Sequence, residues 1–532
     1  MGVILRKLTD KKDKAVILIL CLVLLLTCAC QARSPQEQSQ TTESSSQSQE
    51  IGHLRLTRED WAEDVKTALN DFLMLYGMDS NTPAENPYVV FDFDNTCSIF
   101  DVEEQLAVYQ LQIMAFAIEP EELRGVLLTD LRDSDKDLTE YGYGKGSLND
   151  WADDICAAYT KLWKSYGPFT PEGVAADRID EIQKDPQWQE FSAKMRAMYS
   201  LVYDAQSSSV AYPWVTYWFT GMKEEEIYDL AIKAFTEYMD VETSVAAWTS
   251  PESIVSKTGT VSCTWVSGIQ VTENIRELWR ALDDNGIDVW VCSASCTGAI
   301  RAAIDLFGLH DACTGMLAMT NKTDASGRYL PRYDAETGCG FYADKDGSWT
   351  RMSRPTKAQT QGVGKVTAIV NAIASEYGDR GPIAGFMDST GDFNFCTEFE
   401  TLKLVVCFNR ADRKVTDGGG LIAEVAMYQK DSLKTDLTKA NAAGDTLYVL
   451  QGRDENGKRT LRNSNHTIRL GREEETLFRN SDNETQLKRM IDDNMTVRDI
   501  LNSFGVKQEA GENGFTFKTG FLSEYAGYHT HK

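Results

Sequence analysis

Apolar residues along the middle of the chain follow two patterns that alternate. In one pattern they recur every three or four positions, which predicts amphipathic helices over residues 57–76, 272–286, 297–307 and 363–377. In the other they form short unbroken runs, which predict buried strands over residues 88–92, 287–292, 383–387 and 402–408. Thr57 and Thr272 stand where helix N-caps are expected. Helices that alternate with buried strands favour an α/β fold with a doubly wound, mostly parallel sheet.

Helical periodicity also fills the long segment between the first strand and the next unit. This segment, residues 104–271, is far too long for a loop and predicts an inserted, largely helical domain. The core then comprises residues 53–103 and 272–410, with a strand-containing insertion at about 310–360.

The pattern weakens in the last segment, residues 411–532. Its clearest signal is Asn456-Gly457, a dipeptide typical of tight hairpin turns, between the strand-like runs 446–451 and 458–461. We therefore expect a C-terminal extension that is partly β-hairpin, and the pattern assigns no role to it.

The first 30 residues have the pattern of a targeting segment. Basic residues precede an unbroken apolar run of twelve residues, Ala15 to Leu26, which is too short to span a bilayer and fits the core of a signal peptide. A Thr-Cys-Ala-Cys sequence ending at Cys30 follows, and then a polar tract rich in Ser, Gln and Glu. This order resembles a bacterial lipoprotein signal.

That resemblance implies cleavage before Cys30 and acylation of its thiol, with residues 1–29 as signal peptide and residues 30–52 as a disordered tether. Cys28 is a second candidate, because Thr27 stands where such signals usually carry leucine. Ordinary secretion with incidental cysteines is the other alternative. As a lipoprotein, the chain would be exported and held at the membrane through its lipid alone.

Composition and charge narrow the range of partners. Of the 532 residues, 42% are apolar and 25% charged, as in ordinary soluble proteins, and the length allows more than one domain. The formal net charge of −26 argues against a nucleic-acid-binding surface. None of the twelve cysteines forms a C-x-x-C pair that would suggest zinc. Cys292 and Cys407 are expected as small buried hydrophobes, and Cys313 with Cys339 as a disulfide.

Residues that can do chemistry stand where predicted strands end or a helix begins. In chain order they are Asp92 and Asp94, Ser293, Lys365, and Asp388 with Asp392. The carboxyl ends of parallel strands meet at one edge of a sheet, where open α/β folds bind ligands. Taken singly, these residues could equally be a loop serine, a solvated helix lysine and turn aspartates. Their joint order and strand context favour one shared catalytic site.

The run V-V-F-D-F-D-N-T, which contains Asp92 and Asp94, resembles motif I of the haloacid dehalogenase (HAD) superfamily. The later positions follow in the order of that family's motifs II to IV. The resemblance covers roughly residues 55–410. It implies a Rossmannoid three-layer α/β/α core with a largely helical cap inserted after the first strand.

One position departs from the family pattern. Met387 stands where a glycine usually precedes the motif IV aspartate, and Gly391-Asp392 therefore offers a competing alignment. Asp388 is preferred because it follows the predicted strand directly. Asp392 then takes the second acidic position of the motif, where it would support the metal or reach it through water.

The resemblance also implies a reaction. Asp92 would attack phosphorus and form an aspartyl-phosphate, and Asp94 would act first as general acid and then as general base. Ser293 and the backbone N–H of Ala294 would bind phosphoryl oxygens. Lys365 would neutralise phosphate charge and keep Asp92 ionised and in place.

The implied cofactor is Mg²⁺, a hard cation that takes oxygen ligands. Asp92 and Asp388 would supply carboxylate oxygens, Asp94 its backbone carbonyl oxygen, and Asp392 an outer contact. The second aspartate of motif I matters here, because superfamily members that do not hydrolyse simple phosphate esters lack it.

Asp101 and the cap aromatics bear on the substrate. In phosphoserine phosphatase-like enzymes an acidic residue nine positions after the nucleophile contacts the substrate amine, and Asp101 has this spacing from Asp92. Within that subfamily the sequence is most similar to exported phosphorylcholine phosphatases. Aromatic faces attract quaternary ammonium groups. Trp214 and Trp218 are candidates for that contact, and a place in the cap core is their alternative.

The sequence therefore predicts an exported, Mg²⁺-dependent phosphomonoesterase whose leading substrate is phosphocholine or a similar cationic phosphomonoester. One alternative is a broad-specificity or nucleotide-directed phosphatase with the same core. Another is a tethered, non-catalytic binding lipoprotein on a HAD scaffold. Chemically competent residues at all the motif positions favour an enzyme.

Overall fold

The computed structural model describes most of the chain after residue 54. The described residues are 55–78, 86–336, 340–411, 418–457, 459–477, 481–503, 507–508 and 515–516. The predicted signal peptide, the lipidated Cys30 and the tether lie outside them. So does Cys339 of the expected disulfide, and Cys313 carries a free thiol. Within the described part of the chain, no helix is both long and apolar enough to cross a bilayer.

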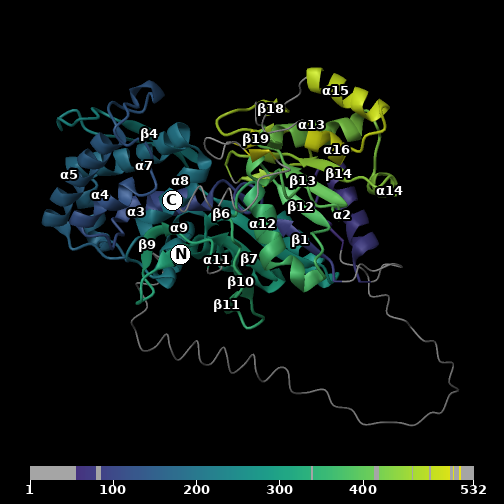
Figure 1. The fold of residues 1–532 in the computed structure, drawn as a ribbon, viewed down its shortest axis with the longest axis horizontal. Coiled ribbons are helices and arrows are strands. Elements are labelled where there is room, and N and C mark those ends of the chain that lie inside the picture. The colour runs from purple at the N-terminus through teal and green to yellow at the C-terminus, as the bar shows by residue number, and fades with distance from the viewer. Residues whose placement is uncertain are drawn as a thin grey trace, which may run out of the picture. The chain divides into compact units, whose positions relative to one another are not determined.

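An eight-stranded sheet forms the centre of the α/β core, in the order β11-β10-β7-β6-β1-β12-β13-β14 (Figure 1). These strands are β1 (Tyr88–Phe91), β6 (Asp288–Cys296), β7 (Gly315–Met319), β10 (Gly340–Ala343), β11 (Trp349–Arg351), β12 (Ala384–Met387), β13 (Leu404–Phe408) and β14 (Leu447–Gln451). β1 pairs in parallel with both β6 and β12. β10 and β11 run antiparallel at one edge. The prediction of a mostly parallel sheet in an α/β fold is confirmed.

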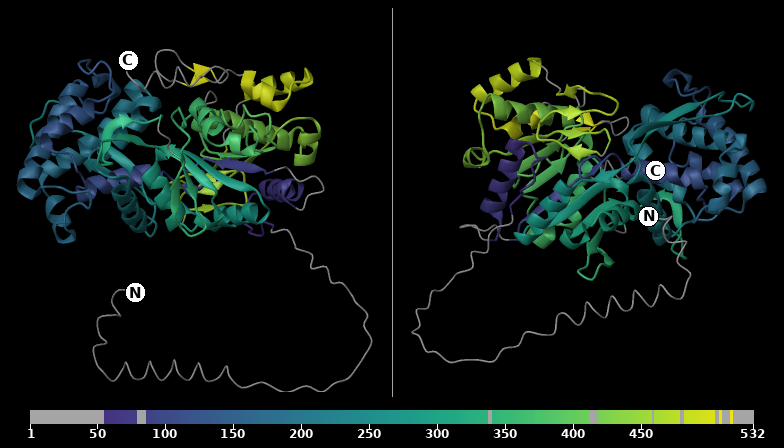
Figure 2. Two further views of the ribbon diagram at one scale, coloured as in Figure 1. Left: turned by 60° about the horizontal axis from the view of Figure 1, so that its bottom comes forward. Right: turned by 180° about the vertical axis from the view of Figure 1, so that it is seen from behind.

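Helices cover both faces of this sheet (Figure 2). Side chains of a strand alternate between faces, so Val89 and Phe91 enter one core while Tyr88 and Val90 enter the other. The first core is covered by α2 (Glu63–Tyr76), α10 (Glu273–Asp284), α11 (Thr297–Leu306) and α14 (Leu437–Ala442). The second is covered by α12 (Val363–Ala372), α13 (Gly418–Asp431), α15 (Ser481–Asp492) and α16 (Val497–Ser503). Because both faces are covered, the central strands are continuous apolar runs.

The predicted helical cap follows β1 (Figure 1). Its helices are α3 (Val102–Ile113), α4 (Pro120–Leu128), α5 (Leu148–Tyr166), α6 (Ile179–Ile182), α7 (Pro186–Gln206), α8 (Ser208–Thr216) and α9 (Glu224–Tyr238). An antiparallel pair, β3 (Ser244–Thr249) and β4 (Ser262–Ser267), closes it. The cap has its own hydrophobic core, with Trp151 and Phe191 among its buried residues. Each large apolar side chain buried in this way stabilises the fold by about 1.5–3 kcal/mol.

Some local predictions were confirmed only in part, and the cap at Thr57 was wrong. α2 begins at Glu63, and Thr57 donates instead to Glu277, from both its backbone N–H and its hydroxyl. Thr272 occupies the N-cap of α10 but makes no capping side-chain hydrogen bond. Within the strand-containing segment 310–360, β7, β10 and β11 extend the central sheet, while β8 (Asn321–Thr323) and β9 (Tyr329–Tyr333) form a separate pair.

The C-terminal hairpin is also displaced from its predicted position. Leu447–Gln451 is buried throughout and pairs with β13 as the last strand of the central sheet. The turn at Asn456-Gly457 instead joins β15 (Arg453–Asp454) to β16 (Thr460–Leu461). With β17 (Thr467–Ile468) and β18 (Glu475–Thr476) these form a small four-stranded sheet. The extension is therefore continuous with the core.

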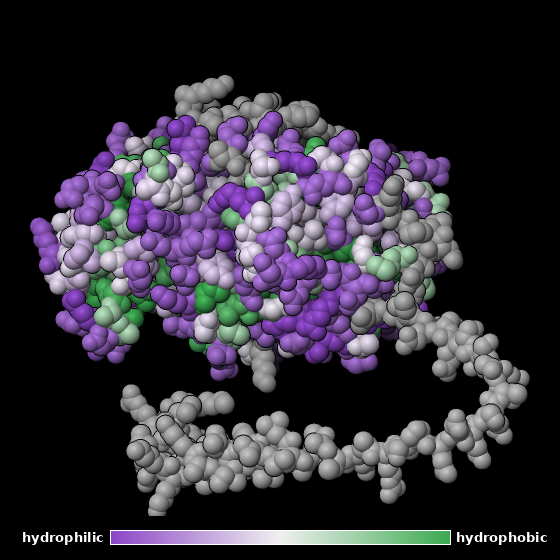
Figure 3. Space-filling model, turned by 90° about the horizontal axis from the view of Figure 1, so that it is seen from below, coloured by the Kyte–Doolittle hydropathy of each residue, from purple (hydrophilic) through white to green (hydrophobic). Residues whose placement is uncertain are grey.

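Hydrophilic residues dominate the molecular face shown in Figure 3, where apolar residues form small separate groups. Among the described residues, the most exposed large hydrophobic side chains include Met78, Val245 and Val255. Scattered exposure of this kind is normal for a soluble domain.

Candidate active site

Lys365 holds two buried carboxylates at the carboxyl end of β1. Its Nζ donates to Oδ1 of Asp92 at 2.6 Å and to Oδ1 of Asp392 at 2.6 Å. The lysine lies in the first turn of α12 and is 1% exposed. Burial opposes the charge on this ammonium, but Asp392 and Asp92 together raise the pKa of Lys365 above its ordinary value. Lys365 is therefore a permanently charged bridge between the two aspartates.

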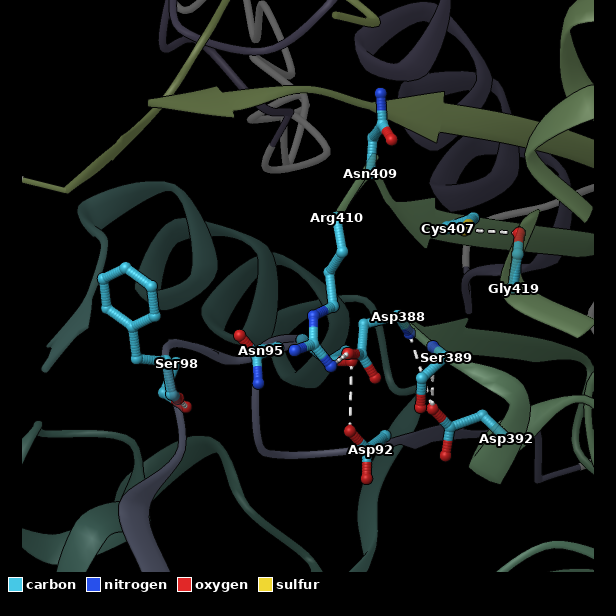
Figure 4. A network of polar contacts seen from close by, with 12 residues as sticks. Asp92, Asn95, Ser98, Asp388, Ser389, Asp392, Cys407, Asn409, Arg410 and Gly419 are labelled. Carbon is cyan, nitrogen blue, oxygen red and sulfur yellow. Dashed lines mark hydrogen bonds and ion pairs between the residues drawn. The ribbon is translucent and has the colours of Figure 1, made fainter. Parts of the chain in front are cut away.

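Asp388 completes a cluster of three carboxylates with Asp92 and Asp392 (Figure 4). Each offers one oxygen within 4.8 Å of the others. Asp388 directly follows β12, and Asp392 ends the short 3₁₀ turn η6 (Thr390–Asp392), where its Oδ2 accepts from the N–H groups of Asp388 and Ser389. Arg410, beyond the end of β13, donates to Asp388 at 3.0 Å.

This cluster fits a hard divalent cation. Burial raises the pKa of Asp92 to about 6, although Lys365 opposes the shift. Burial likewise raises the pKa of Asp388 to about 7 against the influence of Arg410. Buried carboxylates that resist ionisation gain from a nearby cation, and Mg²⁺ is bound through one or two carboxylates and other oxygens. Asp92 and Asp388 would hold such an ion beside Asp392, and the carbonyl of Asp94 remains a predicted ligand.

We expect Mg²⁺ to raise the thermal unfolding midpoint of the protein, and Asp388→Asn to remove most of this rise. An ion that binds the folded state at about 100 times its Kd adds roughly 2.7 kcal/mol to the free energy of unfolding. The measurement is thermal unfolding with and without Mg²⁺ at constant ionic strength. Asp311→Asn, at an exposed carboxylate, is the control. An unchanged Mg²⁺ effect in Asp388→Asn would contradict this site.

Asp94 faces a pair of serines. Its Oδ1 accepts from the backbone N–H of Val102 at 2.6 Å, and its Oδ2 accepts from Ser295 Oγ at 2.5 Å and Ser293 Oγ at 3.5 Å. Burial, together with the negative charges of Asp101 and Asp92, raises the pKa of Asp94 well above its ordinary value. Asp94 can therefore hold a proton more readily than Asp92, whose charged form is stabilised by the ammonium of Lys365.

Ser295 is a site residue that the sequence reasoning missed. β6 continues through Cys296, with an irregularity in its pairing to β7 between Cys292 and Cys296, and the hydroxyls of Ser293 and Ser295 both face Asp94 Oδ2. Ser295 and Ala294 line the cavity described below, whereas Ser293 is fully buried and accepts from the N–H of Ser295 at 3.0 Å. No local signal identified Ser295, because the predicted strand ended at Cys292 and the pairing of β6 is irregular beyond that residue.

The turn after Asp94 has an unusual backbone. Asn95 has φ +62° and Phe100 has φ +75°, both in the left-handed region. Such residues cost on the order of 1–3 kcal/mol each when they are not glycine, and persist only where their surroundings fix them. Asn95 N–H donates to the Phe100 carbonyl at 3.4 Å, and buried Arg453 donates to Asn95. Sequence reasoning missed Arg453, because nothing local connects it to a turn 358 positions away.

A cavity of about 900 Å³ opens over these groups. Asp92, Asp94, Lys365, Asp388 and Asp392 all line it. The wall on the cap side combines acidic and aromatic side chains and one arginine with a few apolar residues: Asp101, Glu103, Glu104, Arg196, Tyr199, Tyr203, Tyr212, Ala107, Val215, Val245 and Val266. The C-terminal extension contributes a second wall that includes Arg453, Glu455, Arg469, Leu470, Arg472, Glu474 and Thr476. The cavity therefore has two walls of different chemistry above one cluster of buried carboxylates and a lysine.

Asp101 lies on the cap side of this cavity and caps α3. Its Oδ1 accepts from the N–H of Glu104 at 2.9 Å. Burial raises the pKa of Asp101 to about 6, and the charge of Glu104 adds to this rise. Glu104 itself pairs with Arg196 of α7. Asp101 thus has two roles, in helix capping and in the negative potential of the cavity.

The structure places Trp214 and Trp218 in the cap core, each 1% exposed, with ring centroids 5.7 Å apart. Neither is among the residues that line the cavity. The aromatic residues that line it are Tyr199 and Tyr203 on α7, Tyr212 on α8, and Phe100 in the turn after Asp94. The spacing of the first two places them on one face of a helix, a signal that the aromatic run around residue 214 obscured.

Comparison with known proteins supports the fold more than the function. No protein-family model matches the chain, and neither does any curated protein. Among solved structures, the chain is similar to a conserved, functionally unknown protein from Anaerococcus prevotii DSM 20548, with 27% identity and a TM-score of 0.60. The similarity covers 78% of this chain and 99% of that one. It is consistent with the α/β fold and assigns no activity.

Proposed function

We propose that this protein is a Mg²⁺-dependent phosphomonoesterase of the HAD type, with Asp92 as nucleophile. The observation that carries the proposal is the bridge from Lys365 to Asp92 and Asp392 beside Asp388, with the separate carboxyl of Asp94 at the same cavity. A phosphate dianion repels an attacking carboxylate unless cations neutralise its oxygens. Lys365 supplies one such charge, and a bound Mg²⁺ would supply the rest.

The residues account for both halves of the reaction. First, a carboxylate oxygen of Asp92 bonds to phosphorus, the bond from phosphorus to the alcohol oxygen breaks, and Asp94 gives that oxygen its proton. Water then attacks phosphorus and gives a proton to Asp94, and Asp92 is freed as inorganic phosphate leaves. The raised pKa of Asp94 suits a group that begins protonated. The proposed donors to phosphoryl oxygens are Ser295 and the N–H of Ala294, because these residues line the cavity, whereas Ser293, the donor expected from the sequence, is fully buried.

A small cationic phosphomonoester such as phosphocholine is the leading substrate. Asp101 provides a carboxylate on the cap side of the cavity, where Tyr199, Tyr203 and Tyr212 add aromatic surface. Carboxylates and aromatic rings together favour a quaternary ammonium group. We also propose that the enzyme is exported and tethered through Cys30, or through Cys28.

A nucleotide-directed phosphatase is the second candidate. Arg469 and Arg472 line the same cavity from the C-terminal extension. The volume of about 900 Å³ is near the upper end for small-molecule sites and would admit a ligand larger than phosphocholine. A nucleoside monophosphate, or another phosphomonoester with additional negative charge, would use these arginines.

Phosphate release from a substrate panel separates these functions. The panel contains phosphocholine, phosphoethanolamine, phosphoserine, a sugar phosphate and a nucleotide, each with Mg²⁺. We expect phosphocholine to be hydrolysed fastest, and Asp101→Asn to weaken its hydrolysis more than that of the sugar phosphate. Asparagine keeps the helix cap and removes the charge. Equal losses of phosphocholine and sugar phosphate hydrolysis in Asp101→Asn would refute cation recognition. Fastest hydrolysis of the nucleotide would support the second candidate. No phosphate release from any substrate would favour a non-catalytic binding protein.

A further inference from the structure

One buried arginine connects the C-terminal extension to the catalytic turn. Arg453, in β15, is 1% exposed. It donates from Nη1 to the backbone carbonyl of Asn95 and from Nη2 to Asn95 Oδ1, both at 3.0 Å. Its Nε and Nη2 also donate to Glu455 Oε1, at 3.1 and 2.7 Å. The guanidinium group is therefore held on one side by Glu455, just beyond β15, and donates on the other side to Asn95 in the turn.

The same guanidinium lies near both left-handed residues of that turn. Its central carbon is 5.9 Å from the centre of the Phe100 ring, in addition to the two hydrogen bonds to Asn95. Hydrogen bonds to a backbone carbonyl and to the side chain of the same residue define both the position and the orientation of the peptide.

The catalytic carboxyl groups depend on the position of this turn. Asp94 immediately precedes Asn95, and its side chain is held by the N–H of Val102 just beyond Phe100. Thr96, on the other side of Asn95, donates to Asp92 Oδ2 at 3.2 Å. A displacement of Asn95 would therefore move the proposed proton donor and a hydrogen-bond partner of the nucleophile together.

We propose that Arg453 is a positioning residue for the reaction. Through Arg453, the C-terminal extension helps to form the active site. This inference rests on the proposed phosphatase function. The role requires the forked guanidinium, because a lysine ammonium offers the charge but cannot span both acceptors in the same geometry. Loss of the fork is expected to lower kcat more than it changes KM, because small displacements of catalytic groups act on the chemical step.

Arg459 provides a matched comparison within the same hairpin. It is 3% exposed, and its guanidinium donates to the carbonyls of Met239 and Val241 and to Thr243 Oγ1 in the cap. It does not line the cavity. Replacing Arg459 therefore removes a buried arginine of the extension without touching the catalytic turn.

The test compares full-length Arg453→Met, Arg453→Lys and Arg459→Met. We expect kcat to fall by about 10- to 100-fold in both Arg453 variants, with KM within about threefold of the parent. In Arg459→Met, kcat is expected to stay within about threefold of the parent.

Full activity in Arg453→Lys would show that charge alone matters. An equal fall of kcat in Arg459→Met would show a general loosening of the fold. Either result overturns the proposal. Glu455→Gln combined with Arg453→Met avoids an unpaired buried carboxylate if the single variant does not fold.

Amide hydrogen exchange gives a readout that is independent of turnover. The peptide 92–102 is expected to exchange faster in Arg453→Met than in the parent, and unchanged in Arg459→Met. If the parent hydrolyses no phosphomonoester while this exchange pattern appears, the proposed function fails and the role of Arg453 in fixing the turn stands. If the parent is an active phosphatase and neither kcat nor exchange responds to Arg453→Met, the positioning role is refuted.

Discussion

Asp92→Asn is expected to lower phosphate release by about 10⁴-fold or more, because an amide cannot form the aspartyl-phosphate. The fold should persist. Burial raises the pKa of Asp92 to about 6, so its charged form is disfavoured in the folded protein. A group whose pKa is higher in the folded state than in the unfolded state stabilises the fold at low pH. This contribution is lost as the pH rises from the unfolded-state pKa through the folded-state pKa. In metal-free buffer near pH 8, the neutral asparagine should therefore leave the free energy of unfolding equal or higher.

The stability difference between Asp92→Asn and the parent should shrink as the pH falls below about 6, where Asp92 itself takes up a proton. Urea unfolding at several pH values measures it, and phosphate release measures the activity. Asp94→Asn is the informative partner, since it keeps the nucleophile and should accumulate phosphorylated protein, detectable by intact mass. Turnover that survives in Asp92→Asn would refute the role of Asp92 as nucleophile. Phosphorylation of Asp92→Asn would mean that the phosphorylated intermediate forms on another residue.

Much of the core could be predicted because its determinants are local. Strands buried on both faces must be continuous apolar runs, so the segments that became β1, β6, β12 and β13 were visible, with ends displaced by a few residues. Asp92 and Asp388 follow such strands directly, Lys365 lies in the first turn of a predicted helix, and the shared sheet edge brought them together. The cap at Thr57 was wrong, because this residue donates to a long-range acceptor, Glu277. Thr272 does occupy the predicted N-cap of α10, without a capping side-chain hydrogen bond.

The parts that could not be predicted depend on contacts between distant segments. Arg453 and Arg410 reach the site from segments with no motif, and β14 was mistaken for half of a hairpin because pairing with β13 leaves no trace in its own pattern. The cap aromatics show the same limit. Composition indicates that aromatic residues are present, but only helix orientation decides that Tyr199 lines the cavity while Trp214 fills the core.

Lys365→Met is expected to impair stability and activity together, in contrast to Asp92→Asn. Removal of the ammonium leaves Asp92 and Asp392 buried without their shared partner, and breaking a buried ion pair in this way costs about 3–5 kcal/mol. Loss of the charge beside the phosphate should lower kcat/KM by on the order of 10³-fold. Urea unfolding in metal-free buffer and phosphate release with Mg²⁺ measure the two effects.

The direction of the pH response distinguishes this mechanism from general damage. Without the ammonium, the carboxylates of Asp92 and Asp392 have pKa values raised still further, so the folded state of Lys365→Met binds more protons than the unfolded state. Its stability should therefore recover as the pH falls toward 5 and decline as the pH rises toward 8.

Mg²⁺ should restore part of the stability of Lys365→Met at pH 8, because a cation at the carboxylates replaces the missing charge. Lys365→Arg, which keeps a charge, should be less destabilised. A loss in Lys365→Met that is independent of both pH and Mg²⁺ would mean that packing, rather than the charge that bridges Asp92 and Asp392, makes this lysine necessary.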